Sequence, residues 1–293
     1  MMDQAQSLRR LVSSQDPKHI AGGESTARII TVCSGKGGVG KSNFTLNFAL
    51  ALKAMGRRVL LFDADIGMAN IDVLMGVTAK YNLYHLLKRE ADIGQIIQLG
   101  PNALPFIAGG SGMDELFSLS ESDLNYFTAQ IAQIADTMDF ILFDTGAGLS
   151  KETMKFITSA DDCLVVTTPE PTAITDAYAL MKVVNNSNPG LSFRLIVNQA
   201  VDEREAVVTS DKIRMAASRF LQLDVPFLGY ISSDVHVVQS VKRQVPFSIA
   251  FPNSAAAKDI QRLALSYLAS GNIEVSKVQG IKGFISKWLK RSK

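Results

Sequence analysis

Residues 28–52, RIITVCSGKGGVGKSNFTLNFALAL, decide the fold of this chain. The stretch begins with a short apolar, β-branched run at 29–34, which predicts a buried strand. The following residues, GKGGVGKS at 35–42, match the spacing G-x-x-x-x-G-K-[ST] and lead directly into a helical pattern. Such a loop turns backbone N–H groups around phosphate oxygens, and the helix N-terminus adds positive potential there. The stretch therefore predicts a nucleotide site, with Lys41 reaching the β- and γ-phosphates and the Ser42 hydroxyl ligating Mg²⁺.

The composition is that of a globular chain. Of 293 residues, 47% are hydrophobic, which is enough to form the core of one large α/β domain. No apolar run approaches the ~20 residues of a membrane span, and the N-terminus lacks the apolar segment of a secretory signal, so we expect a cytoplasmic protein. Cys33 and Cys163 fall within predicted strands, which favours buried thiols over a disulfide or a metal site. The net charge of +2 is too near neutrality to indicate nucleic-acid binding.

Strand and helix patterns alternate after residue 28, which predicts a mostly parallel, doubly wound sheet with helices on both faces. The predicted strands are 29–34, 59–65, 104–108, 140–144, 163–168, 193–198 and 227–231, and the predicted helices include 124–136 and 174–184. Ligands of such sheets bind beyond the carboxyl ends of the strands. This rule singles out Asp63, Asp65, Asn198 and the segments 144–148 and 168–170.

The two ends of the chain differ from the body at 28–272. Residues 1–27 begin with a short helical stripe and continue as a Pro/Gly/Ser-rich linker. The stripe consists of Ala5, Leu8, Leu11 and Val12. Because isolated helices shorter than ~12–15 residues are marginal in water, this stripe either packs on the body or folds onto a partner, and the sequence favours neither.

Residues 273–293 predict a basic amphipathic helix that lies on an anionic membrane surface. Its apolar face includes Ile281, Phe284, Ile285, Trp288 and Leu289, with lysines and an arginine outside that arc. Gly280 and Gly283 each weaken a helix by about 1 kcal/mol, so we expect the tail to be largely unfolded until it meets lipid. Packing of the stripe on the core is the alternative. Nucleic-acid binding is less favoured, because it would leave the apolar face unused.

Three acidic residues lie at the carboxyl ends of predicted strands. Asp144 ends the run FILFD, where a carboxylate can hold a Mg²⁺-bound water. Asp63 and Asp65 stand two apart, so both project to one face of an extended strand, and their repulsion suits a site with a cation or ordered water between them. A helix cap or a simple loop is the structural alternative for each.

Lys36 is a second lysine within the loop and could stabilise phosphate charge as an arginine finger does, across a subunit interface. A solvated loop lysine is the alternative. With Lys36 in place, KGGVGKS resembles the deviant Walker A motif of the MinD/ParA/Mrp family of ATPases. VLLFDADIGMANIDVLMG at 59–76 resembles the family's switch-I region, and DTGAG at 144–148 resembles its D-x-P-A-G switch, with Gly146 in place of proline. The similarity spans about 28–268.

The resemblance implies a P-loop ATPase that hydrolyses ATP to ADP and phosphate with Mg²⁺. It implies an ATP-dependent sandwich homodimer, in which Lys36 of each subunit contacts the nucleotide of the other. Asp65 matches the water-activating aspartate, beside Lys36 and Lys41 as catalytic groups, and Asp63 and Asp144 join Ser42 around the metal. The nucleotide-binding residues implied are Gly35, Lys36, Gly37, Gly38, Val39, Gly40, Lys41, Ser42, Asn43, the adenine-reading Asn198, and Tyr230, Ile231, Ser232 and Asp234 beside the base and ribose.

The chain ends resemble one branch of that family. The segment carrying Asp3, Gln4, Ala5, Leu8 and Arg9 resembles the D-Q-A-x-x-L-R segment of the FlhG (YlxH) branch, which regulates flagellar number and placement. TTPEPTAITDAYALMK at 167–182 is similar to the same branch. The resemblance implies that the N-terminal segment activates the GTPase FlhF, with Gln4 acting on the partner's nucleotide, and that the protein contacts the flagellar C-ring proteins FliM and FliN or FliY.

The sequence thus favours a switch ATPase that cycles between a cytosolic monomer and a dimer bound peripherally and reversibly at the inner face of the cell membrane. A MinD-like division-site regulator and a ParA-like DNA-partitioning ATPase remain alternatives. A binding module without hydrolysis is disfavoured by the joint presence of Lys41, Ser42, Asp65 and Asp144.

Overall fold

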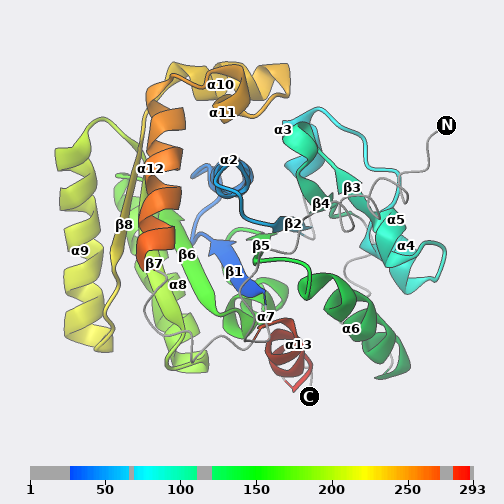
Figure 1. The fold of residues 1–293 in the computed structure, drawn as a ribbon. Helices are drawn as coiled ribbons and strands as arrows, with labels where there is room; N and C mark the ends of the chain where they lie inside the picture. Colours follow the sequence, from blue (N-terminus) through cyan, green and yellow to red (C-terminus); the bar gives the residue numbers. More distant parts are fainter. Residues whose placement is uncertain (1–26, 66–68, 111–120, 271–279, 291–293) are drawn as a thin grey trace.

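The structure, a computed structural model, describes residues 27–65, 69–110, 121–270 and 280–290 (Figure 1). Its centre is an eight-stranded sheet in the order β3-β4-β2-β5-β1-β6-β7-β8. The strands are β1 Arg28–Cys33, β2 Val59–Ala64, β3 Ile97–Leu99, β4 Pro105–Ile107, β5 Phe140–Thr145, β6 Asp162–Thr167, β7 Ser192–Ala200 and β8 Phe227–Ser232. Every neighbouring pair is parallel except β3 and β4. All seven predicted strands are therefore confirmed to within two residues, and β3 was missed.

Helices cover both faces of the sheet (Figure 1). They are α2 Lys41–Ala54, α3 Ile71–Met75, α4 Leu83–Leu87, α5 Ile93–Ile96, α6 Glu121–Ala135, α7 Lys151–Ser159, α8 Pro171–Ser187, α9 Glu203–Leu221, α10 Val235–Arg243, α11 Phe247–Ala250, α12 Ala255–Ser270 and α13 Gly280–Lys290, with a 3₁₀ turn at Pro101–Ala103. Side chains of β1 alternate between the two faces: Ile30 joins the core under α2 and α12, whereas Ile29 joins the core under α6 and α13. The predicted doubly wound α/β fold is confirmed.

The two cysteines lie in the sheet, where the sequence predicted buried thiols. Cys33 and Cys163 are both free and fully buried. Their Sγ atoms lie 2.9 Å apart on the neighbouring strands β1 and β6. The prediction of buried structural thiols is confirmed.

A buried carboxylate joins the two ends of the body at the amino edge of the sheet. Asp162, the first residue of β6, accepts a hydrogen bond from Arg28 Nε at 2.5 Å and another from the Tyr267 hydroxyl at 2.6 Å. Arg28 opens β1, and Tyr267 lies in the last turn of α12. Burial, with the charge of Asp162, raises the pKa of Tyr267 well above its ordinary value, so this phenol donates its proton to the carboxylate.

Helix α13 is docked on the body, and the expectation that the tail is unfolded until it meets lipid is wrong for residues 280–290. Phe284 and Trp288 are only 4% and 3% exposed. The Phe284 ring stacks on Phe143 of β5 at 4.9 Å and 9°, and Trp288 lies 6.2 Å from the Phe156 ring of α7. Burial of each aromatic side chain contributes about 1.5–3 kcal/mol, which outweighs a glycine penalty of about 1 kcal/mol.

The packing alternative therefore describes this helix in the isolated chain. The side chains of Ile281, Ile285 and Leu289, which complete the predicted apolar face, lie outside the described residues. Within the described ranges, every helix is too short or too polar to cross a bilayer. The predicted boundaries at 27/28 and 272/273 stay predictions, because residues 1–26 and 271–279 lie outside the described part of the chain.

Candidate functional site

The loop between β1 and α2 needs its glycines for two reasons, a left-handed backbone and close packing against neighbouring elements. Gly38 and Gly40 have φ of 81° and 85°, in the left-handed region that favours glycine. A Cβ added at Gly35 would lie 2.2 Å from the backbone oxygen of Asp176 on α8, and one at Gly40 would lie 2.3 Å from Asn198 Nδ2. The glycines thus let neighbouring elements press against the loop while its backbone curls around a cup.

The cup opens into a cleft of about 780 Å³. Its lining includes Ser34, Lys36, Gly37, Gly38, Val39, Gly40, Lys41, Ser42 and Asn43 from the loop and the start of α2. Asp65, Gly146 and Thr153 line it from the segments after β2 and β5 and from α7. The structure therefore brings together nearly all the predicted phosphate-binding residues. Gly35 is the exception, since it packs against α8 behind the cleft.

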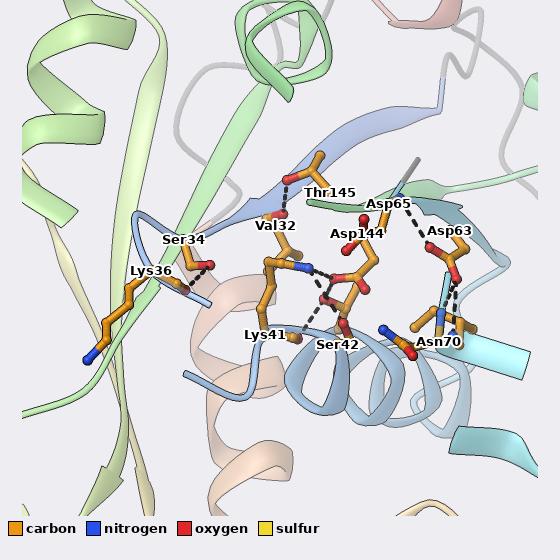
Figure 2. Close-up of polar contacts among 12 residues, drawn as sticks. Val32, Ser34, Lys36, Lys41, Ser42, Asp63, Asp65, Asn70, Asp144 and Thr145 are labelled. Atoms are coloured by element: carbon orange, nitrogen blue, oxygen red, sulfur yellow. Dashed lines mark hydrogen bonds and ion pairs between the residues drawn. The ribbon is translucent and has the colours of Figure 1, made fainter. Parts of the chain in front are cut away.

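Lys41 and Asp144 form a buried ion pair at the base of the cleft (Figure 2). Lys41 Nζ donates to Asp144 Oδ1 at 2.9 Å, and the two side chains are 7% and 1% exposed. Thr45 Oγ1 donates to the same oxygen at 2.9 Å. Sequence reasoning missed Thr45, although its position one turn after Lys41 on α2 places both on one face of the helix. Lys41 therefore holds a buried positive charge at the point where a phosphate would bind.

The oxygen ligands at this point suit a nucleotide-bound Mg²⁺. The Ser42 hydroxyl oxygen lies 3.5 Å from Lys41 Nζ, which itself contacts Asp144. Mg²⁺ prefers oxygen ligands and commonly takes one or two carboxylates together with substrate phosphates and waters. Among the described residues, no group of three or more His, Cys, Asp or Glu side chains could hold a metal by itself. Ser42 and Asp144 therefore fit a metal that arrives with its nucleotide.

The two aspartates at the end of β2, Asp63 within the strand and Asp65 just after it, have separate environments. The carboxylate of Asp63, 1% exposed, accepts hydrogen bonds from the backbone N–H groups of Asp65, Asn70 and Ile71 at 3.2, 2.9 and 3.0 Å (Figure 2). Burial, and next the charge of Asp144, raise the pKa of Asp63 to about 7. Asp65 instead lines the cleft. Asp63 thus fixes the segment after β2, and its predicted place around the metal stays a prediction.

Gly146 lies close to Asp65 where the related motif has proline. A Cβ added to Gly146 would lie 3.4 Å from Asp65 Oδ1 and 3.5 Å from Thr153 Oγ1. These are close or ordinary van der Waals distances, so the position has little spare room. The switch-like segment at 144–148 therefore lies beside the Asp65 carboxylate, which is predicted to orient the attacking water.

Lys36 points away from Lys41 in this state (Figure 2). Its Nζ donates to Glu170 Oε2 at 2.6 Å and to Thr172 Oγ1 at 3.0 Å, at the N-terminal end of α8. The Lys36 side chain is 39% exposed and that of Glu170 63%. The strand-end rule had singled out Glu170, but Thr172 was missed because only the fold brings it to the loop. The exposed position leaves Lys36 able to exchange one anionic partner for another.

The predicted base-reading residues lie at the ends of β7 and β8, outside the lining of the phosphate cleft. Asn198 Nδ2 donates to the Val39 backbone oxygen at 2.7 Å and so supports the phosphate loop. The Ile231 side chain, 3% exposed, packs in the core. The Arg262 guanidinium lies 5.1 Å from the centre of the half-buried Tyr230 ring.

The segment after β8 is held by two aspartates. Asp259 Oδ2 accepts hydrogen bonds from the backbone N–H and the hydroxyl of Ser232 at 2.8 and 2.7 Å. Asp234 caps α10 by accepting from the His236 N–H at 2.9 Å. The contact of these residues with adenine stays a prediction. The predicted partner-activating residues, Asp3, Gln4, Ala5, Leu8 and Arg9, lie outside the described residues.

Comparisons with known proteins identify relatives of this chain. A family model described as an AAA domain matches residues 27–195. The antiactivator FleN of Pseudomonas aeruginosa is 35% identical over 81% of this chain and 85% of its own. The flagellum site-determining protein YlxH of Helicobacter pylori is 35% identical over 99% of both chains.

Solved structures of similar fold include two archaeal proteins. The cell division ATPase MinD of Pyrococcus furiosus superposes with a TM-score of 0.69 at 27% identity, over 83% of this chain and 99% of its own. MinD of Pyrococcus horikoshii, complexed with Mg-ADP, has a TM-score of 0.68 at 26% identity, over 85% of this chain and 100% of its own.

Proposed function

Since this chain belongs to the AAA domain family, as a MinD/ParA-type ATPase of the branch that contains FleN and YlxH, we propose that it is an ATP-dependent dimeric switch that regulates the number and placement of flagella. The observation that carries the nucleotide chemistry is the buried Lys41–Asp144 pair at the base of the glycine-lined cleft. The flagellar role is supported by the similarity to YlxH of Helicobacter pylori, a flagellum site-determining protein.

Nucleotide binding rearranges the buried pair. A phosphate placed in the cup competes with Asp144 for Lys41, because a phosphate carries more negative charge than one carboxylate. Ser42 and Asp144 would hold the metal, which neutralises charge on the phosphates when bound. Asp65 lines the cleft, which supports a role for it in orienting the attacking water. The chain's own contribution to hydrolysis is thus positioning and charge stabilisation.

Lys36 couples the site to a second copy of the chain. In the isolated chain, Glu170 and Thr172 hold its Nζ outside the cup. In the proposed sandwich dimer, Lys36 leaves Glu170 and reaches the nucleotide of the other subunit. An exposed ion pair is worth at most about 1 kcal/mol, so the exchange costs little. Formation of the dimer therefore depends on a triphosphate, which offers the stronger anionic partner.

Membrane association requires that α13 separate from the body. Phe284 and Trp288 are buried against the body, so they cannot contact lipid while docked. One released tail binds reversibly, whereas two tails on a dimer bind with much greater avidity, because the second attachment is intramolecular. We infer that the ATP dimer is the form found peripherally at the inner face of the cell membrane, and that the single chain is cytoplasmic.

The partners we propose are the GTPase FlhF, activated by the segment that carries Asp3, Gln4, Ala5, Leu8 and Arg9, and the C-ring proteins FliM and FliN or FliY. These follow from the resemblance of the N-terminal segment to the FlhG branch.

Gel filtration with vesicle sedimentation tests the nucleotide-dependent steps. With ATP and Mg²⁺, Asp65→Ala should accumulate as a dimer and sediment with acidic vesicles, since it binds ATP but hydrolyses it slowly. Lys36→Ala and Lys41→Ala should remain monomeric and stay in the supernatant. If calorimetry detects no ATP binding by the folded wild-type protein with Mg²⁺, the proposal fails at its first step.

A further inference from the structure

A second cleft lies at the amino edge of the sheet, away from the phosphate loop. It has a volume of about 490 Å³, and its lining comes from the end of α2, the start of β2, α5, the hairpin of β3 and β4, and the last turns of α6. The apolar part of the lining is formed by Val59, Ile93, Ile97, Leu99, Ile134 and Met138. Lys53, Arg58 and Asp136 add charge. We name this cleft the basal groove.

The floor of the basal groove is continuous with the hydrophobic core under α4, α5 and α6. Ile93 and Ile97 belong to that core, and Ile134 and Met138 pack at its border. Leu99, on the edge strand β3, is 37% exposed. Apolar side chains placed in the groove would therefore extend an existing core and remove exposed apolar surface from water, which is favourable.

The chain enters the described structure beside this groove. The Arg28 N–H donates to the Asp139 backbone oxygen at 2.9 Å, and the Asp139 N–H donates to the Arg58 backbone oxygen at 2.8 Å. The Arg58 guanidinium pairs with the Asp139 carboxylate at 2.6 Å. Arg58 lines the groove, and Met138, which precedes Asp139, also lines it. The first described residues, Ala27 and Arg28, thus lie beside the groove's rim.

We propose that the basal groove is the resting site of residues 3–12 of the same chain. That segment carries the apolar stripe of Ala5, Leu8, Leu11 and Val12, which needs a surface to cover it. The linker at 13–27 spans up to about 50 Å when extended, which is ample for a site beside Arg28.

Tethering favours this occupant over the same segment of a second copy of the chain. The segment has Asp3 near its start and Arg9 and Arg10 near its end, and the groove offers Lys53 and Asp136 as opposite charges, while Arg58 is paired with Asp139. A short flexible tether gives an effective concentration in the millimolar range. A groove on another molecule competes only at its bulk concentration, which is micromolar in ordinary solution.

Docking would make the segment unavailable to a partner, and this consequence rests on the proposed function. A partner that uses residues 3–9 must first draw them out of the groove. Activation would therefore be weaker for the docked chain than for a variant in which the groove is blocked but the segment is intact. Leu99→Glu is such a variant, because Leu99 is partly exposed on an edge strand and tolerates a polar side chain.

Hydrogen exchange of the full-length protein, followed by mass spectrometry, tests docking without any partner. We expect peptides covering 97–105 and 133–138 to exchange about tenfold faster in Leu8→Asp/Leu11→Asp than in the wild type, because losing two buried leucines shifts docking at least tenfold. Gln6→Asp/Ser13→Asp is the matched control. It adds the same charge on the opposite side of the predicted stripe and should exchange like the wild type.

Leu99→Glu should release the segment from the groove side, with faster exchange in peptides covering residues 3–12 and a melting temperature close to that of Leu8→Asp/Leu11→Asp, because both variants lose the same docking. Equal exchange in the wild type and Leu8→Asp/Leu11→Asp would overturn the proposal. Groove protection that rises with protein concentration would also overturn it, in favour of a second copy as occupant. If docking is observed but Leu99→Glu stimulates GTP hydrolysis by FlhF no better than the wild type, the docking stands and its proposed consequence fails.

Discussion

Phe284→Ala should release α13 from the body without unfolding the rest of the protein. The Phe284 ring is 4% exposed and stacks on Phe143 at 4.9 Å. Its removal takes about 1.5–3 kcal/mol of burial and about 0.5–1.5 kcal/mol of aromatic pairing from the docked state. The combined loss of about 2–4.5 kcal/mol raises the ratio of released to docked helix by ~30-fold to ~2,000-fold. The effect on global stability is smaller, because it cannot exceed the free energy of docking.

Trp288 makes this release directly observable. It is the single tryptophan of the chain, and it is 3% exposed against α7. In Phe284→Ala, the emission maximum of Trp288 should shift to longer wavelength, and its indole should become accessible to quenching by acrylamide. The circular dichroism spectrum should change little, because the body stays folded. Ser286→Ala is the control, since Ser286 is an exposed residue on the same helix. Wild-type fluorescence and quenching in Phe284→Ala would refute the reasoning, because the stacked ring would then contribute nothing to docking.

Three further outcomes are expected. Burial raises the pKa of Asp63 to about 7 in the folded protein, so protonation of Asp63 stabilises the fold at low pH and this contribution is lost as the pH rises through 7. Relative to Asp63→Asn, the free energy of unfolding of the nucleotide-free wild type, measured with urea, should fall by about 3 kcal/mol between pH 5 and pH 8. Parallel pH profiles of the two proteins would contradict this. Gly40→Ala places a Cβ 2.3 Å from Asn198 Nδ2 at a φ of 85°, which distorts the phosphate loop. Calorimetry should therefore find an ATP affinity at least about tenfold weaker than that of the wild type. An unchanged affinity would show that the loop relaxes. Glu170→Ala breaks an exposed ion pair with Lys36, so the free energy of unfolding should change by less than about 1 kcal/mol. Because Lys36 no longer has to leave Glu170, the ATP-dependent dimer should form at a lower protein concentration, as measured by sedimentation. Dimerisation at the wild-type concentration would mean that Glu170 does not restrain Lys36.

The phosphate loop and seven strands could be predicted from the sequence, because each is encoded within a few consecutive residues. Glycine spacing fixes the cup at 35–42, and short apolar runs mark buried parallel strands. The edge strand β3 was missed because it has only three residues, Ile97–Leu99, and pairs antiparallel at the border of the sheet.

Features that depend on distant parts of the chain were not predictable. The apolar face of α13 indicated that something covers it, but not that Phe143 and Phe156 do so. The spacing of Asp63 and Asp65 predicted one shared face. In the structure β2 ends at Ala64, so Asp65 lies outside the strand and does not share the face of Asp63.

The shared carboxylate of Asp162 makes the body almost a closed ring of polypeptide. Arg28 and Tyr267 both bond to it, so the first strand and the last helix of the body meet at one point. Proteins with adjacent ends tolerate circular permutation. A short bridge from Ser270 to Arg28, with new ends opened in the turn between β7 and α9, should therefore yield a folded body freed of both end segments, in which nucleotide binding can be studied by itself.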